Sequence, residues 1–119
     1  MSRAAFLAFV LAFAQSPAGA CGEVISIDTH DGSTTRYALA RPGSGQAGEG
    51  QVALVLLAGG GGHLDLDDKG CPRSLAGNSL VRSLPLFHAE GFVTALVDAP
   101  SDHPGEDGLA GFRSTPQHA

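Results

Sequence analysis

The segment Val52–His63 constrains the fold more than any other part of this chain. It reads V-A-L-V-L-L-A-G-G-G-G-H, seven apolar residues followed directly by four glycines. A short unbroken run of aliphatic and β-branched residues is typical of a strand covered on both faces, as in a parallel sheet. Gly59–Gly62 allow the backbone to turn sharply and to approach a ligand closely, because no Cβ intervenes. Ligands of open α/β sheets bind just beyond the carboxyl ends of the strands. We therefore expect this segment to supply a core strand and the edge of a site.

Upstream of this segment, the pattern predicts an antiparallel hairpin. Glu23–Thr29 alternates apolar and polar residues, as a half-buried strand does. Asp31-Gly32 is a strong turn signal, and Ser33–Ala40 fits the returning strand. A loop rich in glycine, proline and serine, Arg41–Gly50, then leads into the core strand.

Downstream, the pattern predicts a helix and a second apolar strand. Asn78 or Ser79 can cap a helix that runs to Glu90, and Pro85 should kink it by removing a backbone hydrogen bond. Phe92–Val97 is the second strand. Strand, helix and strand in this order predict a βαβ unit with parallel strands. The expected fold class is α/β, with an antiparallel hairpin followed by a βαβ unit.

Residues 1–20 have the three-part pattern of a secretory signal peptide. A short basic head is followed by the apolar run Ala4–Ala14, a break at Pro17, and the small-residue site Ala18-Gly19-Ala20. The run of 11 residues is too short to span a bilayer, which takes about 20. A buried N-terminal helix is the alternative. We expect an exported protein, periplasmic or secreted, whose single domain is residues 21–119.

The two cysteines, Cys21 and Cys71, leave three alternatives open. Export would place them in an oxidising compartment, where a disulfide persists. A bridge that closes a loop of this length stabilises the fold by about 4 kcal/mol on the chain-entropy model. Because Cys21 directly follows the cleavage site, it can instead carry a lipid anchor. Free thiols are the third alternative.

Charge and spacing exclude several kinds of partner. The net charge is −5 and the basic residues are scattered, which argues against nucleic acid. The glycines do not fit the G-x-G-x-x-G spacing of a dinucleotide site, so no cofactor is expected. The acidic segment His63–Gly77, with Asp65, Asp67 and Asp68, matches no calcium loop and is interpreted as a solvated loop. Asp98, at the end of the second strand, is either a loop cap or an acid that faces a ligand.

Four segments resemble the N-terminal part of bacterial α/β-hydrolases of the dienelactone-hydrolase-like kind. They are Leu56–His63 (L-L-A-G-G-G-G-H), Gly77–Ser83 (G-N-S-L-V-R-S), Phe92–Asp102 (F-V-T-A-L-V-D-A-P-S-D) and Gly108–Arg113 (G-L-A-G-F-R). The resemblance implies a partial α/β-hydrolase sheet and a serine hydrolase acting on a small ester or amide, without a cofactor. In that fold the loop after the core strand donates a backbone N–H to the oxyanion hole. The resemblance therefore points to Gly60 and Gly61, with Gly59 or Gly62 as alternatives.

The chain departs from that family because it contains no G-x-S-x-G motif. The nucleophile, acid and base of such an enzyme would follow the segments described above. Ser114–Ala119 has the cap and the proline of a starting helix, so the chain is expected to be truncated. An oxyanion loop without an attacking group performs no acyl transfer at a useful rate. The alternative is a non-catalytic exported binding module or an inactive fragment.

Overall fold

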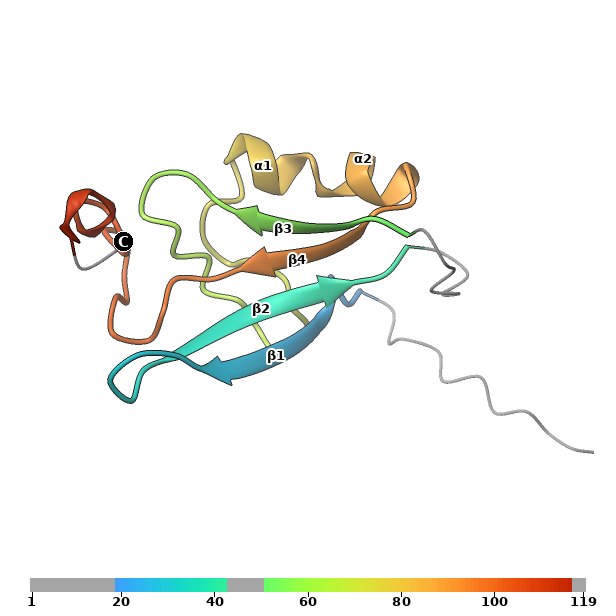
Figure 1. The fold of residues 1–119 in the computed structure, drawn as a ribbon. Coiled ribbons are helices and arrows are strands. Elements are labelled where there is room, and N and C mark those ends of the chain that lie inside the picture. Colours follow the sequence, from blue (N-terminus) through green and yellow to red (C-terminus); the bar gives the residue numbers. More distant parts are fainter. Residues whose placement is uncertain (1–18, 43–50, 117–119) are drawn as a thin grey trace, which may run out of the picture.

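The computed structural model describes residues 19–42 and 51–116, and these form one four-stranded mixed sheet with short helices along one side (Figure 1). The elements in chain order are β1 (Glu23–Asp28), β2 (Thr34–Ala40), β3 (Ala53–Leu57), α1 (Ser79–Arg82), α2 (Leu84–Ala89), β4 (Val93–Val97) and the 3-10 turn η1 (Phe112–Ser114). Residues 1–18, nearly all of the predicted signal peptide, lie outside the described part. So does most of the predicted loop at 41–50 and the last part of the expected C-terminal helix start.

The predicted hairpin is confirmed. β1 and β2 pair antiparallel, with Ile25 opposite Tyr37. The turn between them places Asp31 at φ 47° and Gly32 at φ 76°. Two successive positive φ angles match the right-handed twist of the flanking strands, which is why an Asp-Gly pair favours this turn.

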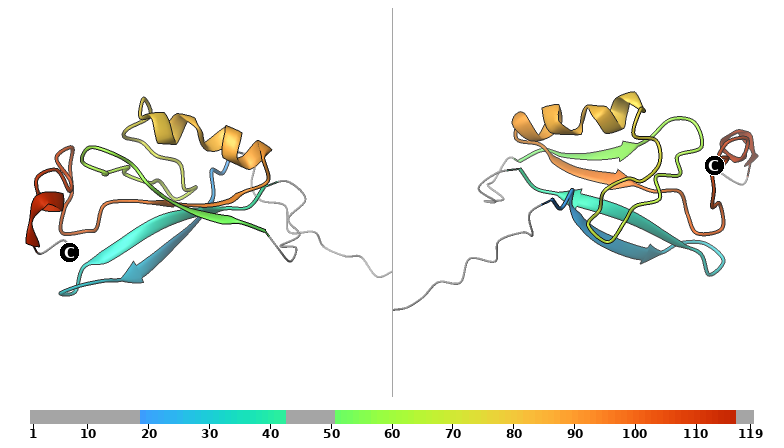
Figure 2. Two further views of the ribbon diagram at one scale, coloured as in Figure 1. Left: turned by 45° about the horizontal axis from the view of Figure 1, so that its top comes forward. Right: turned by 180° about the vertical axis from the view of Figure 1, so that it is seen from behind.

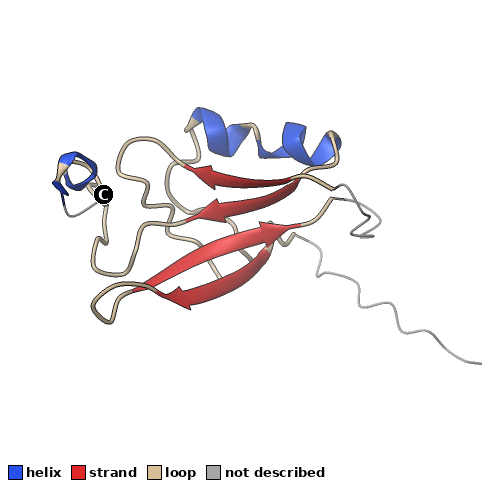
Figure 3. Cartoon of the chain, viewed as in Figure 1, coloured by secondary structure: helices blue, strands red, loops and turns tan. Residues whose placement is uncertain are grey.

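The βαβ unit is also confirmed. β3 and β4 pair parallel, with Leu56 opposite Leu96, and the crossover between them carries α1 and α2 (Figure 3). β2 joins the other side of β4 in antiparallel register, which gives the strand order β1-β2-β4-β3. The result is a small mixed sheet, compatible with part of an α/β fold.

The prediction that the apolar run forms a strand covered on both faces is wrong. β3 is an edge strand, and β4 lies inside the sheet between β2 and β3. Leu56 is buried, whereas Val55 is 71% exposed and Leu57 is 65% exposed. Successive side chains of a strand point to opposite faces, so a strand with one covered face leaves every second residue in solvent. Periodicity alone could not reveal this, because all of the residues are apolar.

The prediction of a single kinked helix from residue 78 to 90 is also wrong, although the predicted cap is confirmed. The Asn78 side chain accepts a hydrogen bond from the Leu80 N–H at 3.0 Å and begins α1. α1 ends at Arg82, and Pro85 lies in the first turn of the separate helix α2. A proline costs nothing there, since the first N–H groups of a helix have no partner within it. The crossover therefore consists of two separate helices, and Pro85 lies at the start of the second one.

The loop between β3 and α1 forms much of the core. Leu64 and Leu66 are both 0% exposed and pack with Ala38, Leu56 and Leu96 of the sheet. The interpretation of this segment as a solvated loop is therefore wrong for its leucines, although Asp68 is exposed. Alternation of leucine and aspartate places one set of side chains on the sheet and the other toward solvent.

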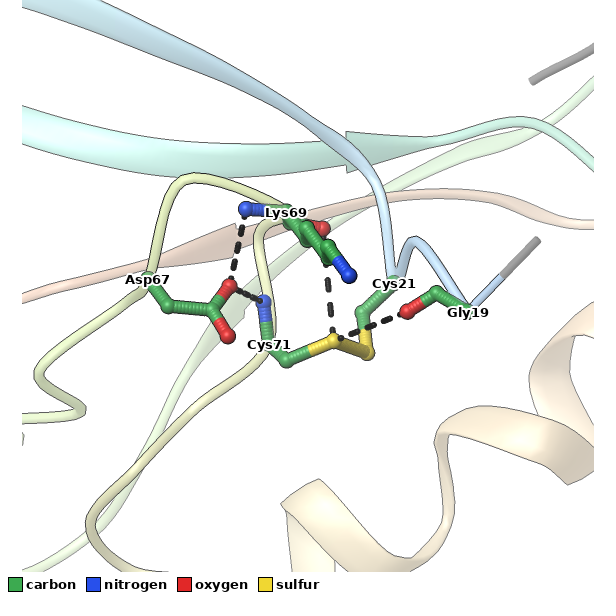
Figure 4. Close-up of a disulfide and its surroundings, with 5 residues drawn as sticks. All are labelled: Gly19, Cys21, Asp67, Lys69 and Cys71. Carbon is green, nitrogen blue, oxygen red and sulfur yellow. Dashed lines mark hydrogen bonds between the residues drawn. A yellow bond between two sulfur atoms is a disulfide. The ribbon is translucent and has the colours of Figure 1, made fainter. Parts of the chain in front are cut away.

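Cys21 and Cys71 are joined in a disulfide, the first of the three alternatives (Figure 4). The bond ties the residues before β1 to the loop that covers the sheet, 50 positions later. In this state the Cys21 sulfur has no free valence for a lipid. The Asp67 carboxylate accepts hydrogen bonds from the N–H groups of Lys69 and Cys71, at 2.8 and 2.9 Å. The bond from Cys71 is the main cause that lowers the pKa of Asp67.

Candidate functional site

The glycine loop follows β3 at the carboxyl end of the parallel strand pair, the place where α/β sheets bind ligands. Neither the Gly60 N–H nor the Gly61 N–H donates a hydrogen bond to any described residue. Gly60 has φ 69°, and a Cβ there would meet nothing within 4 Å, so this part of the loop faces open space. The two positions expected from the resemblance therefore carry donors that no described group uses.

The segment before η1 packs tightly against the other side of the loop. The Leu109 N–H donates to the Gly61 carbonyl at 2.7 Å. A Cβ at Gly61 would collide with the backbone oxygens of Glu106 and Asp107. Arg113 donates from Nη2 to the Ala58 carbonyl at 3.0 Å. Only glycine permits this close approach, which fixes the position of the loop.

Asp98 holds the residues that follow the glycines. Its carboxylate accepts hydrogen bonds from the backbone N–H groups of Leu64 at 2.6 Å, Leu66 at 3.1 Å and Ala99 at 2.8 Å. Asp98 is only 8% exposed, and His63 Nδ1 lies 3.8 Å from the same carboxylate. Of the two alternatives left open by the sequence, the observed contacts are those of a loop cap. Bonds from N–H groups to an ionised carboxylate are among the stronger hydrogen bonds of proteins.

A shallow groove of about 260 Å³ lies between the end of the sheet and the segment before η1. Its apolar walls are Leu57 and Val97 from the sheet with Leu109 and Phe112 from the C-terminal segment. His30 lies at its polar side. The groove is smaller than the usual range for a drug-sized ligand, roughly 300–1,000 Å³, so it suits one small apolar group.

Ser33, His30 and Asp102 form a chain of contacts that has the order of a catalytic triad. His30 Nε2 lies 2.9 Å from the Asp102 carboxylate, and His30 Nδ1 lies 3.5 Å from Ser33 Oγ. The hydrogen bond with His30 is the main cause that lowers the pKa of Asp102. However, Ser33 is 6% exposed, and its hydroxyl donates to the His30 carbonyl at 2.7 Å. A nucleophile must reach its substrate, so Ser33 is a turn-stabilising residue here.

The acidic loop contains no metal site that the structure supports. Asp65 pairs with Arg73 at 2.9 Å, and Asp67 accepts backbone N–H groups of its own loop. No group of three or more histidine, cysteine, aspartate or glutamate side chains within residues 19–42 and 51–116 could hold a metal ion. No helix in this same part of the chain is long and apolar enough to cross a membrane.

Sequence reasoning missed the contact between His30 and Asp102, which are 72 positions apart. His30 follows β1 and Asp102 follows β4, and these two strands run in the same direction, so both residues lie at the same edge of the sheet. The sequence does not reveal this strand order. It also missed the Arg36 guanidinium, which donates to the Leu66 carbonyl at 2.9 Å and fixes the covering loop to β2.

Comparison with known proteins adds no identity: no family model, no curated protein and no solved structure matches this chain.

Proposed function

We propose that this chain is the N-terminal part of an exported α/β-hydrolase-type enzyme that acts on ester or amide bonds. In this proposal Gly60 and Gly61 donate their backbone N–H groups to the oxygen that becomes negative in the transition state. The groove beside them holds a small apolar group of the substrate. The nucleophile, its base and the acid come from a part of the enzyme that this sequence does not contain.

The observation that carries the proposal is the pair of unused donors at Gly60 and Gly61. They lie just after a parallel strand, which is where such a fold places its oxyanion loop. The groove is connected to them through Leu109, which lines the groove and donates its N–H to the Gly61 carbonyl. A donor about 3 Å from a developing oxyanion contributes roughly 3–4 kcal/mol to the transition state. The contacts of Gly61 and Asp98 keep the loop in place before a substrate arrives, and preorganised donors are the ones that accelerate reactions.

A fluorophosphonate probe tests the proposal, because it modifies only an activated serine. Applied to the exported fraction, it should label a polypeptide whose digest also contains the peptide with Gly59–His63. The 119-residue chain by itself should stay unlabelled. Labelling of a serine in this chain, such as Ser33, would refute the division of roles. So would the absence of label from every polypeptide that contains this peptide.

A non-catalytic binding module is the second candidate, and the disulfide together with the covering loop favours it. Both lie within the described residues and close a small core over one face of the sheet. A chain that is stable alone would unfold in one cooperative transition. The absence of fluorophosphonate label from every polypeptide that contains the Gly59–His63 peptide, together with a cooperative melt of residues 21–119, would favour this candidate over the enzyme.

A further inference from the structure

The groove follows the edge of the sheet at which β3, β4 and β1 end. Its lining comes from each strand in the order of the sheet: Leu57 from β3, Val97 from β4, Thr35 from β2 and His30 from the turn after β1. The segment after β4 lies beyond the same edge in both views of Figure 2, and its residues Leu109 and Phe112 form a wall of the groove. The groove therefore crosses the sheet from the glycine loop to the hairpin turn.

The end of the groove next to the glycine loop is apolar. Leu57 ends β3 just before the glycines and lies opposite Val97 in the parallel register. Leu109 lines the same end, and its N–H donates to the Gly61 carbonyl at 2.7 Å. An apolar group attached to a carbonyl that reacts at this loop would leave water against these three side chains.

The end of the groove at the hairpin turn is polar. Thr29 and Thr35 bring hydroxyl groups, and His30 brings its imidazole. His30 Nε2 lies 2.9 Å from the Asp102 carboxylate, and the two side chains are 49% and 42% exposed. His103 Nε2 lies 3.9 Å from the same carboxylate. Water therefore still solvates the His30–Asp102 pair, and a group that covers the pair removes that water.

We propose that the His30–Asp102 pair is the stop that limits the apolar group of the substrate to a short chain. Neighbouring strands lie about 4.8 Å apart, so the apolar floor from β3 to β4 is about as long as a butyl group. A longer chain reaches the hairpin turn and displaces water from the pair. Covering a polar or charged group without replacing its hydrogen bonds to water is unfavourable. The substrate class is therefore an ester or amide with a short apolar chain, an assignment that rests on the proposed function.

A series of alkylphosphonates tests the stop, with the ¹⁵N-labelled chain observed by NMR and ethyl-, butyl- and octylphosphonate as the probes. Each methylene that leaves water completely tightens binding by about fourfold. Butylphosphonate should bind at least about fivefold more tightly than ethylphosphonate, because its two added methylenes lie on the apolar floor of a shallow groove. Octylphosphonate should bind no more tightly than butylphosphonate, to within about twofold, because its tail must cover the polar end.

His30→Leu replaces the polar stop by an apolar side chain. The ratio of the butylphosphonate dissociation constant to the octylphosphonate dissociation constant should rise at least about fivefold over the parent. Asp102→Leu should raise the ratio in the same direction, and it keeps the test open if His30→Leu fails to fold. His30→Gln is the matched control, because its amide can still donate to Asp102, so its ratio should equal that of the parent. The ratio reports selection by chain length, which a general loss of stability does not change.

An octyl tail that tightens binding to the parent as strongly per methylene as the butyl tail would overturn the proposal. An unchanged ratio in both leucine variants would overturn it as well. Either result would leave the proposed function standing if the Gly60 and Gly61 signals still move with every probe. Length selection at the Leu57 and Leu109 signals, without movement of the two glycines, would uphold the stop and refute the oxyanion role. Failure of all three probes to bind would overturn both.

Discussion

Replacing Asp98 should lower the free energy of unfolding markedly, although the side chain is small. Its carboxylate accepts three backbone N–H groups, and two of these belong to Leu64 and Leu66, which are both 0% exposed. Asp98→Ala leaves those two donors without a partner away from water. Each unsatisfied buried N–H costs about 1–3 kcal/mol, so the variant, with two of them, should lose about 2–6 kcal/mol of the free energy of unfolding. That is a large part of the stability of a domain of this length, which is roughly 5–15 kcal/mol.

Asp98→Asn gives a graded version of the same test. Its amide oxygen can still accept two of the N–H groups, but its NH₂ group faces a third donor. We expect a loss of about 1–3 kcal/mol. Asp68→Asn is the control, because Asp68 is exposed and should change stability by less than about 0.5 kcal/mol.

Urea unfolding under non-reducing conditions measures all three variants, and amide hydrogen exchange locates the effect. Exchange at the Leu64 and Leu66 amides should accelerate in Asp98→Asn, while the amides of the hairpin stay protected. A free energy of unfolding for Asp98→Ala within 1 kcal/mol of Asp68→Asn would refute the reasoning, because the carboxylate would then not be holding the loop.

Three further predictions concern the disulfide, the glycine loop and pH. Replacing Cys21 and Cys71 by alanine together should cost about 4 kcal/mol in urea unfolding, because the bridge closes a 50-residue separation; a loss under 1 kcal/mol would contradict it. Gly61→Ala should lower the melting temperature through its collision with the backbone of the C-terminal segment, at a cost of about 1–3 kcal/mol, whereas Gly59→Ala meets nothing within 4 Å and should melt like the parent. Asp102 has a lowered pKa in the fold, so the stability it contributes is present above its usual pKa and is lost as the pH falls through the folded value. Asp102→Asn should therefore reduce the loss of the free energy of unfolding at acid pH. An unchanged acid loss would contradict the pairing of Asp102 with His30.

The local features of this fold can be predicted from the sequence. The Asp31-Gly32 turn and the Asn78 cap each depend on residues within a few positions, and both were predicted from those residues. The parallel pairing of the two apolar strands follows from the order strand, helix, strand.

Long-range order is what the sequence did not reveal. An all-apolar strand looks the same in the middle of a sheet and at its edge, so β3 was misplaced. Leu64 and Leu66 alternate with polar residues, and the segment is held against the sheet by hydrogen bonds with Asp98 and Arg36, which are distant in the sequence. The sequence predicts the glycine loop at the end of β3, but it does not predict the groove, because the groove depends on where the C-terminal segment packs.

The most direct test of the account is an NMR titration of the ¹⁵N-labelled chain with butylphosphonate, an oxyanion that carries a small apolar tail. The amide signals of Gly60 and Gly61 should move downfield and saturate together, because their N–H groups have no partner among the described residues. Signals of α1 and α2 should stay in place and serve as the internal reference. Saturable shifts of these two glycines and of groove residues such as Leu57 and Leu109, with the helix signals unchanged, are what the account predicts. Glycine signals that do not move, or that move no more than those of the helices, would contradict the claim that this loop receives an oxyanion.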